Sequence, residues 1–382
     1  MLIVEAKLAQ EIVDRTMKII PFNVNVMDAR GIILGSGEAF RIGSLHDGAQ
    51  LALAQQRTVE IDSATMSHLH GVKPGVNLPL SVRGQICGVV GLTGDPEAVR
   101  QFGELVRVTA EMILEQAQLI GELQRERRYR EEFLFQLVKG GISRTELEAW
   151  AIRIGVEFSC PRVVVILNLL NESLRPDLAL IELQHCQTQL AENRPELLTA
   201  LISHRELVIL DSFDLSGIRV TKPAFARQRL VALDLALRDT LKTPAAMSMG
   251  VALTGIEGVA LSYQSALRTL RVGRLRNLHE TLFSFYDLSL PVLLAGLDFG
   301  WQAEQFRQPL QRLGTSGKRG ALLRRTLGVW FAQNGHPVAT AKALRIHRNT
   351  LDYRLRTIGD LTGLNLENTD DRLLLYIALQ LE

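Results

Sequence analysis

The segment ATAKALRIHRNTLDYRLRTIGDLTGL, Ala339–Leu364, decides how the C-terminal part of this chain is interpreted. Its apolar residues recur at the spacing of two successive helices. The inward-facing set that we predict is Val338, Ala341, Leu344, Ile346, Leu351, Leu355 and Ile358. The small side chain of Ala341 lets two helices cross closely, so the pattern predicts a helix-turn-helix. One departure is that Arg345 stands at the turn, where many such motifs have glycine.

Polar and basic residues occupy the other side of this segment, and most cluster at the start of the second helix. The predicted DNA-contacting residues are Lys342, His347, Arg348, Asn349, Thr350, Tyr353, Arg354 and Arg356. Arginine pairs with guanine and asparagine with adenine in the major groove, while Thr350 and the helix N-terminus suit a phosphate. An ordinary hairpin with a solvated polar face is the alternative. The excess of basic over acidic residues here, in a chain of net charge +2, favours double-stranded DNA as the partner.

The composition is that of an ordinary globular protein. The 382 residues are enough for two or three domains, with 47% hydrophobic and 22% charged residues. Cys87, Cys160 and Cys186 lie far apart, so neither a disulfide framework nor a zinc site is expected. No signal peptide and no apolar run of membrane-spanning length is evident. We therefore expect a cytoplasmic protein with no membrane partner, no metal and no cofactor.

The chain divides into three regions by its pattern of elements. Residues 8–20 read as a helix, followed by two strand pairs and a long helix that begins after Asp95 and continues to about residue 138. The charged second half of this helix predicts pairing with a second copy or a link between two moving parts. Strands and helices then alternate, and nearly everything after residue 290 is helical. These patterns predict a multidomain α+β protein.

Quoted segments from both ends resemble one family. The segments AKALRIHRNTLDYRLRTIGDLTGL, NVNVMDARGIILGSGEAFRIGSLHDGA and LHGVKPGVNLPLSVRGQICGVVGLTG are similar to the PucR/carbohydrate diacid regulator family of bacterial transcription factors. The resemblance implies a sugar-diacid recognition domain at 1–120, a linker or coiled-coil helix at 121–140, a degenerate GGDEF- or cyclase-like domain at 141–289 and a helix-turn-helix domain at 290–382. The alternation of strands and flanking helices predicts a PAS- or Cache-like fold for the first of these.

The same resemblance implies the function. The resemblance implies that the protein, like members of this family, activates genes for the uptake and breakdown of glucarate, galactarate and glycerate. The expected partners are a DNA operator, a sugar diacid effector, a second copy of the chain in a dimer or higher even oligomer, and RNA polymerase. Three alternatives stay open: the same architecture sensing another small organic acid, a signalling cyclase or phosphodiesterase with a DNA-binding tail, and a scaffold whose basic helix binds protein.

The middle region is not expected to be an enzyme. In active relatives a hairpin carries two glycines and two acids, so that phosphate and Mg²⁺ can bind. The corresponding hairpin here is LISHRELVIL, where Ser203, His204 and Arg205 replace the glycines and first acid and only Glu206 remains. GTSGKRG, residues 314–320, lacks the spacing of a phosphate-binding loop.

A sugar diacid is a dianion with several hydroxyl groups, so its site needs cations or N–H donors and side chains that exchange hydrogen bonds. The predicted ligand-binding residues are Arg41, His46, His70, Lys73, Gly75, Asn77 and Thr93. Gly75 exposes backbone amides in VKPGVN, and the helix that begins near His46 presents an N-terminus that favours an anion. Arg57 and Arg83 are predicted to be surface residues. The pair His68 and His70 is too small a ligand set to predict a metal site.

Overall fold

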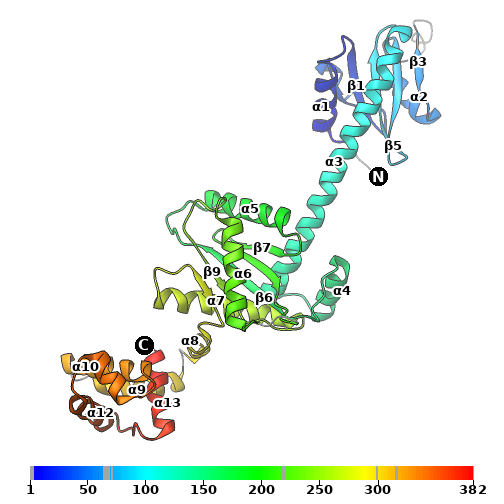
Figure 1. Ribbon diagram of the computed structural model, residues 1–382. Helices are drawn as coiled ribbons and strands as arrows, with labels where there is room; N and C mark the ends of the chain where they lie inside the picture. Colours follow the sequence, from blue (N-terminus) through cyan, green and yellow to red (C-terminus); the bar gives the residue numbers. More distant parts are fainter. Residues whose placement is uncertain are drawn as a thin grey trace. The chain divides into compact units, whose positions relative to one another are not determined.

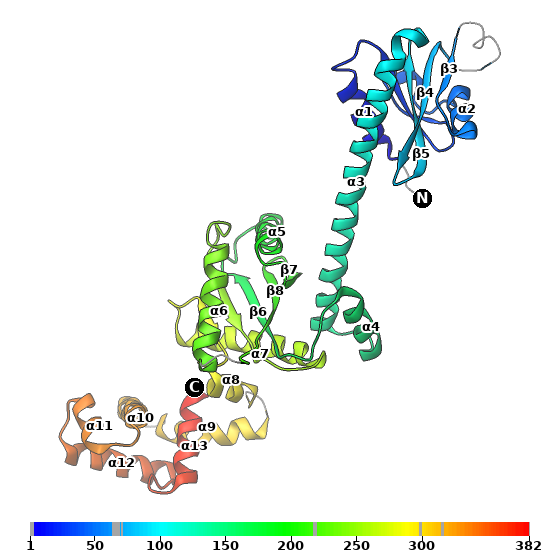
Figure 2. The same cartoon turned by 45° about the vertical axis from the view of Figure 1, so that its right-hand side comes forward.

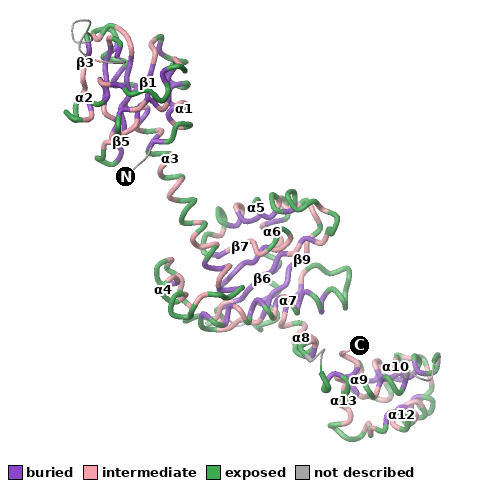
Figure 3. Tube along the Cα trace, turned by 180° about the vertical axis from the view of Figure 1, so that it is seen from behind, coloured by how far each residue is buried: buried purple, intermediate pink, exposed green. Residues whose placement is uncertain are grey.

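The computed structural model describes residues 4–62, 69, 72–216, 220–297, 300–314 and 317–381. The chain forms two compact units, residues 1–128 and 129–382, and each is described by itself (Figure 1). The strands of both units are largely buried (Figure 3). The predicted mixture of α and β structure, with an all-helical C-terminal region, is confirmed.

Unit 1 is built on a five-stranded antiparallel sheet in the order β2-β1-β5-β4-β3. Its elements are α1 (Ala6–Thr16), β1 (Asn23–Asp28), β2 (Ile33–Ser36), the 3-10 turn η1 (Ala39–Arg41), α2 (Asp47–Gln55), β3 (Val59–Ile61), β4 (Gly75–Val82), β5 (Gln85–Thr93) and the first part of α3 (Pro96–Lys139). Alternation along β1 explains the two faces: Val24 and Val26 point to one side, and Asn25 and Met27 to the other.

Helices cover both faces of this sheet (Figure 2). α1 and α3 pack on the face that carries Val24, Val26 and Leu78, and together they form the larger core. α2 packs on the opposite face against Met27 and Val89. This second core is small, because most of the remaining positions on that face are polar residues or glycines, as described below.

The long helix α3 belongs to both units. It begins after Asp95, whose carbonyl oxygen accepts the backbone N–H groups of Ala98 and Val99. The sequence predicts a linker over 121–140. The last turns of this segment are part of a folded core, since Phe133 and Leu134 are fully buried among residues of unit 2. The free part of the helix is therefore shorter than predicted.

Unit 2 begins with a second five-stranded sheet in the order β10-β9-β6-β8-β7, in which only β10 and β9 are parallel. Its elements are α4 (Arg144–Ile154), β6 (Arg162–Leu169), α5 (Pro176–Asn193), β7 (Leu198–Ser203), β8 (Glu206–Ser212), α6 (Lys222–Leu237), β9 (Ala245–Met249), α7 (Glu257–Arg276) and β10 (Leu282–Ser284). α5 and α6 cover one face, and α7 with the end of α3 covers the other. The strands and helices predicted for this region are all present.

The C-terminal region is helical. Its elements are α8 (Ser289–Leu294), the 3-10 turn η3 (Ala295–Leu297), α9 (Trp301–Gly314), α10 (Gly317–Ala332), α11 (Pro337–Leu344), α12 (Arg348–Thr362) and α13 (Thr369–Gln380). Buried residues from α9, α10, α12 and α13, among them Leu310, Leu327, Ile358 and Leu375, form a single core. This core holds α12 in place by one face only.

Candidate nucleic-acid interface and effector site

Helices α11 and α12 form the predicted helix-turn-helix. Ala341 of α11 and Leu351 and Ile358 of α12 are buried, and Leu355 packs at the edge of the core. The prediction that Val338 also faces inward is wrong, because its side chain is 66% exposed. Val338 lies in the first turn of α11, directly after Pro337.

The turn between the two helices has an arginine, Arg345, at the position where many such motifs have glycine. Arg345 adopts a left-handed backbone conformation, with φ of 55°. This conformation closes α11, because the N–H of Ile346 reaches back to the carbonyl of Ala341 at 3.0 Å. Glycine enters this region without strain, whereas an arginine does so at a cost. Arg345 thus differs from the usual glycine in residue type, whereas its backbone has the left-handed conformation that a glycine adopts at such a turn.

The N-terminus of α12 is directed to solvent. His347 caps the helix, since its Nδ1 accepts the backbone N–H of Asn349 at 3.3 Å. Arg348, Asn349 and Thr350 are all exposed. Arg348 Nε lies 3.9 Å from the Asp352 carboxylate, an exposed ion pair without a hydrogen bond. The arrangement has the geometry by which a recognition helix meets base edges.

The other predicted contact residues differ in orientation. Lys342, Tyr353 and Arg356 are exposed, as a binding surface requires. Arg354 is half-buried, and its Nη1 donates to Thr326 Oγ1 of α10 at 3.3 Å. Arg354 therefore ties α12 to the body of the domain, because its side chain runs along the helix pair instead of outward.

One neighbouring residue was not predicted. Arg319 of α10 is exposed and donates from Nη2 to the hydroxyl of Tyr353 at 3.2 Å. Its cationic group thus extends the basic surface of α12 onto a third helix. The sequence around Arg319, GKRG, lacks the spacing of a phosphate-binding loop and gives no other sign of function. The position of Arg319 beside Tyr353 depends on tertiary packing.

Unit 1 contains a row of residues across β2, β1, β5 and β4 in which three side chains are polar. Strand pairing places Asn25 of β1 and Asn77 of β4 on either side of Gly91 of β5, with Ser36 next to Asn25. Directly paired residues point to the same face of a sheet. Asn25, Ser36 and Asn77 are all buried, and Ser36 Oγ donates to Asn25 Oδ1 at 2.6 Å.

A second row lies beside the first on the same face. Asn23, Thr93 and Gly75 are paired across β1, β5 and β4. A Cβ atom on Gly75 would lie 1.9 Å from the Leu92 carbonyl oxygen, so only glycine fits there. The two rows together form what we term the polar floor: Asn23, Asn25, Ser36, Gly75, Asn77, Gly91 and Thr93. Of these, Gly75, Asn77 and Thr93 were predicted as ligand-binding residues.

α2 lies above this floor. A Cβ atom on Gly48 would be 2.9 Å from Asn77 Nδ2 and 3.1 Å from His46 Cε1, so the three residues are close neighbours. Asn77 Oδ1 is buried and accepts no hydrogen bond from the described residues. Buried polar atoms are normally satisfied. This oxygen can accept a hydrogen bond from an N–H or O–H donor.

His46 and Arg41 supply the ionisable groups near the floor. His46 caps α2 through Nδ1, which accepts the N–H of Ala49 at 3.2 Å, so the neutral ring carries its proton on Nε2 as a donor. Burial, and then the positive charge of Arg41, lower the pKa of His46 to about 4. Arg41 is itself buried in η1. The site thus has a neutral histidine N–H donor beside a buried guanidinium.

The remaining predicted ligand residues are less suited to that role or are not described. Lys73 Nζ forms an ion pair with the Glu38 carboxylate at 2.7 Å, which offsets its charge. His70, like His68, lies outside the described residues. Arg83 lies at the β4–β5 turn and pairs with Glu122 on the surface, as predicted.

The turn of the β7–β8 hairpin carries Ser203, His204 and Arg205, and β8 begins at Glu206. The acid nearest this turn, Glu206, accepts a hydrogen bond from the hydroxyl of Tyr263 at 2.7 Å. Burial and this carboxylate raise the pKa of Tyr263. Among the residues that the structure describes, there is no group of three or more His, Cys, Asp or Glu side chains arranged to hold a metal ion. In the same residues, no helix combines the length and apolar character needed to cross a membrane.

Family models match three parts of the chain. They are described as "putative sugar diacid recognition" at residues 4–137, "GGDEF-like domain" at 139–272 and "PucR C-terminal helix-turn-helix domain" at 323–381. Mixed α/β domains followed by this helix-turn-helix define a multidomain DNA-binding regulator of the PucR type.

Whole-chain relatives narrow this class. The chain is 46% identical over 378 residues to the carbohydrate diacid regulator of Escherichia coli (strain K12), covering 99% of this chain and 98% of that protein. The chain belongs to the PucR/carbohydrate diacid regulator family. It is also 36% identical to an uncharacterized protein of Haemophilus influenzae, with 98% of each covered. A regulator of polyketide synthase expression from Bifidobacterium adolescentis, of known structure, is 14% identical with a TM-score of 0.34, covering 66% of this chain and 97% of that one.

Proposed function

We propose that this chain is a ligand-responsive activator that binds operator DNA and controls genes for the uptake and breakdown of sugar diacids such as glucarate, galactarate and glycerate. The observation that carries this proposal is the exposed N-terminus of α12, where Arg348, Asn349 and Thr350 face solvent while Leu351 and Ile358 anchor the helix. A surface of this kind on a core-anchored helix is suited to the major groove.

Phosphate contacts would come from the periphery of this surface. Lys342, Arg356, Arg319 and the hydroxyl of Tyr353 surround the base-reading residues. Such contacts fix the register of a protein on duplex DNA and make binding depend on salt. The proposal therefore includes a salt dependence that a helix binding to an uncharged protein surface would lack.

Unit 1 is proposed to be a PAS- or Cache-like sensor with the effector on its polar floor. Support comes from the five antiparallel strands, the long exit helix α3 and the concentration of amides and hydroxyls on one sheet face. Asn25, Ser36, Asn77 and Thr93 offer both donors and acceptors to ligand hydroxyls. Arg41 offers a buried cation to one carboxylate.

The middle domain is proposed to act as a non-catalytic spacer between sensor and DNA-binding domain. The pairing of Glu206 with Tyr263 supports this role, because the acid nearest the hairpin turn is already engaged. We further propose that the regulator acts as a homodimer and contacts RNA polymerase as an activator. Two recognition helices must lie about 34 Å apart to read half-sites one turn apart, so small movements of α3 would alter operator affinity.

A thermal-shift screen of the full chain against a panel of sugar acids tests the effector. Binding to the native state raises apparent stability. A sugar diacid should raise the melting temperature more than the monoacid of the same sugar, and Asn77→Ala should reduce this rise. Asn277→Ala, at an exposed asparagine of unit 2, is the matched control. A larger response to an unrelated small acid would assign the sensor to a different metabolite.

A further inference from the structure

Helix α3 has two apolar faces, and the sheet covers only one of them. Val99, Val106, Ala110 and Leu114 are buried against the core of unit 1. On the opposite side of the helix, large apolar side chains are between 46% and 65% exposed. These residues, which we term the outer stripe, are Leu105, Val108, Met112, Leu119 and Leu123.

The outer stripe has a regular period. Its positions advance by 3, 4 and 4 residues, so that Val108 is repeated at Leu119 and Met112 at Leu123, each eleven positions later, while Leu105 corresponds to Gln116. A repeat of eleven residues keeps side chains on one side of a nearly straight helix. From Leu105 to Leu123 the stripe is about 27 Å long at 1.5 Å per residue. Scattered surface residues would show no such period.

We infer that the outer stripe is the contact surface between two copies of this chain, with their α3 helices side by side and parallel. The stripe can meet itself, because in a parallel pair the two-fold axis runs along the helices and each residue faces the same residue of the partner. Leucine, valine and methionine at successive layers are the residues that pair helices in this way.

The charges at the edges of the stripe specify the parallel orientation. The acidic edge carries Glu104, Glu111, Glu115 and Glu122. Glu104 and Glu111 pair with Arg107, and Glu122 pairs with Arg83, so part of this negative charge is offset. The other edge carries Thr109, Ile120 and Arg127. In a parallel pair each edge meets the unlike edge of the partner, whereas in an antiparallel pair the two acidic edges would meet.

The dimer contact does not depend on the proposed function. Only its consequence for DNA binding rests on that proposal. Because α3 continues to Lys139, a parallel pair keeps sensor, middle domain and DNA-binding domain in the same order in both copies. That order is what two half-sites of an operator require. The contact itself depends on the stripe alone.

The mass of the full chain in solution, measured by sedimentation velocity over a concentration series, tests the contact. Met112→Glu and Leu119→Glu should weaken dimerisation on the order of 100-fold, because each places a charge in an apolar contact. Ile152→Glu is the control, at a side chain of α4 that is 81% exposed. It should leave the dimer intact. A native chain that is monomeric throughout, or a Met112→Glu chain that dimerises as the control does, overturns the inference.

Disulfide trapping tests the orientation. In a Cys160→Ser background, Leu105→Cys should form a covalent dimer on mild oxidation, because Leu105 faces itself in a parallel pair. Gln124→Cys, about a third of a turn away from the stripe, should not. A cross-link that forms only when Leu105→Cys and Leu123→Cys chains are mixed would show an antiparallel pair and overturn the proposal. A monomeric chain would also overturn the proposed homodimer. Neither experiment contains DNA or a diacid, so the proposed DNA binding and effector response are tested separately.

Discussion

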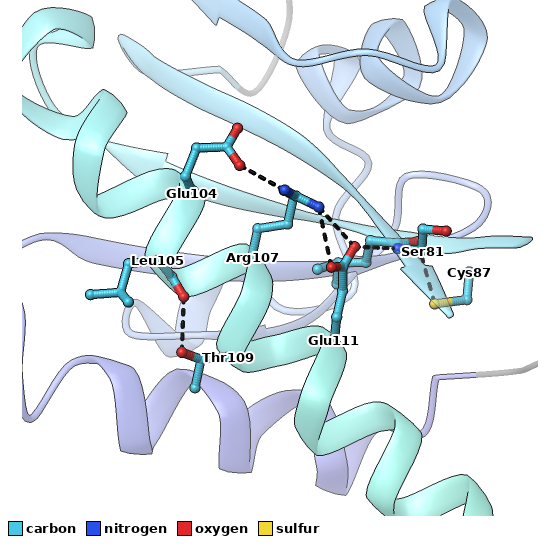
Figure 4. Close-up of polar contacts among 8 residues, drawn as sticks. Ser81, Cys87, Glu104, Leu105, Arg107, Thr109 and Glu111 are labelled. Atoms are coloured by element: carbon cyan, nitrogen blue, oxygen red, sulfur yellow. Dashed lines mark hydrogen bonds and ion pairs between the residues drawn. The ribbon is translucent and has the colours of Figure 1, made fainter. Parts of the chain in front are cut away.

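The carboxylate of Glu111 in α3 accepts the backbone N–H of Ser81 in β4 at 2.8 Å (Figure 4). The bond occurs where β4 shifts its register against β5, between Leu80 and Ser81. Arg107 donates to both oxygens of the same carboxylate, at 3.2 and 3.1 Å, and so holds it in place. β4 also carries Asn77 of the polar floor, and thus one strand connects the proposed effector site to the exit helix.

Removal of this carboxylate should weaken both unit 1 and its response to an effector. Glu111→Ala leaves the Ser81 N–H unsatisfied, which costs about 1–3 kcal/mol of the free energy of unfolding. Glu111→Gln keeps an acceptor oxygen and should lose less. Calorimetry measures the first effect, and the ratio of DNA affinities with and without diacid measures the second. Glu104→Ala removes an exposed partner of Arg107 and serves as the control. If Glu104→Ala reduces the effect of the diacid on DNA affinity as much as Glu111→Ala does, β4 and α3 are not coupled through Ser81.

The stability of unit 1 should depend on the protonation of His46. The pKa of His46 is about 4 in the folded chain and near 6.5 when exposed. Between these values the unfolded chain binds more protons, so the free energy of unfolding falls as the pH drops from about 6.5 to about 4, and this loss is complete below that range. The shift corresponds to roughly 3 kcal/mol.

His46→Asn tests this dependence. Asparagine retains a side-chain oxygen that caps a helix but does not titrate. Calorimetric scans at about pH 7 and about pH 5 should show a smaller loss of stability in the variant than in the native chain. Equal losses in both would mean that His46 is not the group that titrates.

The turn of the helix-turn-helix should accept glycine. Arg345→Gly removes the strain of a left-handed side chain and should raise the free energy of unfolding by up to about 1 kcal/mol. Arg345→Val, a β-branched residue, should lower it by a similar amount. Thermal unfolding followed by tryptophan fluorescence in a Trp150→Phe background reports on this region, since the remaining Trp301 and Trp330 lie in its helices α9 and α10 and Trp330 lies in its core. The opposite order of the two variants would contradict the backbone conformation described here.

Gly121 weakens α3 beyond the sheet. It lies within the helix, and a Cβ atom there would meet nothing within 4 Å. Gly121→Ala should therefore stabilise the helix by about 1 kcal/mol. Gly103→Ala is the matched control, because its Cβ would lie 3.1 Å from the side chains of Leu78 and Val76. Hydrogen exchange of the amides around residue 121 should slow in the first variant only. No change in exchange would mean that the helix is not limited by this glycine.

Much of the architecture follows from local pattern. The strands of the middle domain are continuous apolar runs, and the helices of the C-terminal region keep a clear 3.6-residue period, so both were predictable. Val338 fits the same period, but it lies in the first turn of α11 and its side chain is exposed. Periodicity indicates which residues share a face and does not show how far the covering helix extends.

The polar floor was only partly predictable for a related reason. Asn23 and Asn25 alternate in NVNV, which places them on one strand face, and this signal was available in the sequence. Their proximity to Asn77 depends on the register of three strands that meet at Gly91, far along the chain. The position of Arg319 beside Tyr353 likewise depends on the packing of α10 against α12. This part of the site is formed by contacts between segments that are far apart in the sequence, so local patterns do not predict it.

The central claim is that the start of α12 reads DNA under the control of a diacid. Its most direct test is the affinity of the full chain for a duplex that it selects from a random library, measured by fluorescence anisotropy with and without glucarate. We expect tighter binding to this duplex than to a scrambled one, a change of several-fold on adding glucarate, and a loss of about 1–3 kcal/mol in Arg348→Ala but not in Arg175→Ala. Equal affinity of native and Arg348→Ala chains for the selected duplex would contradict the account.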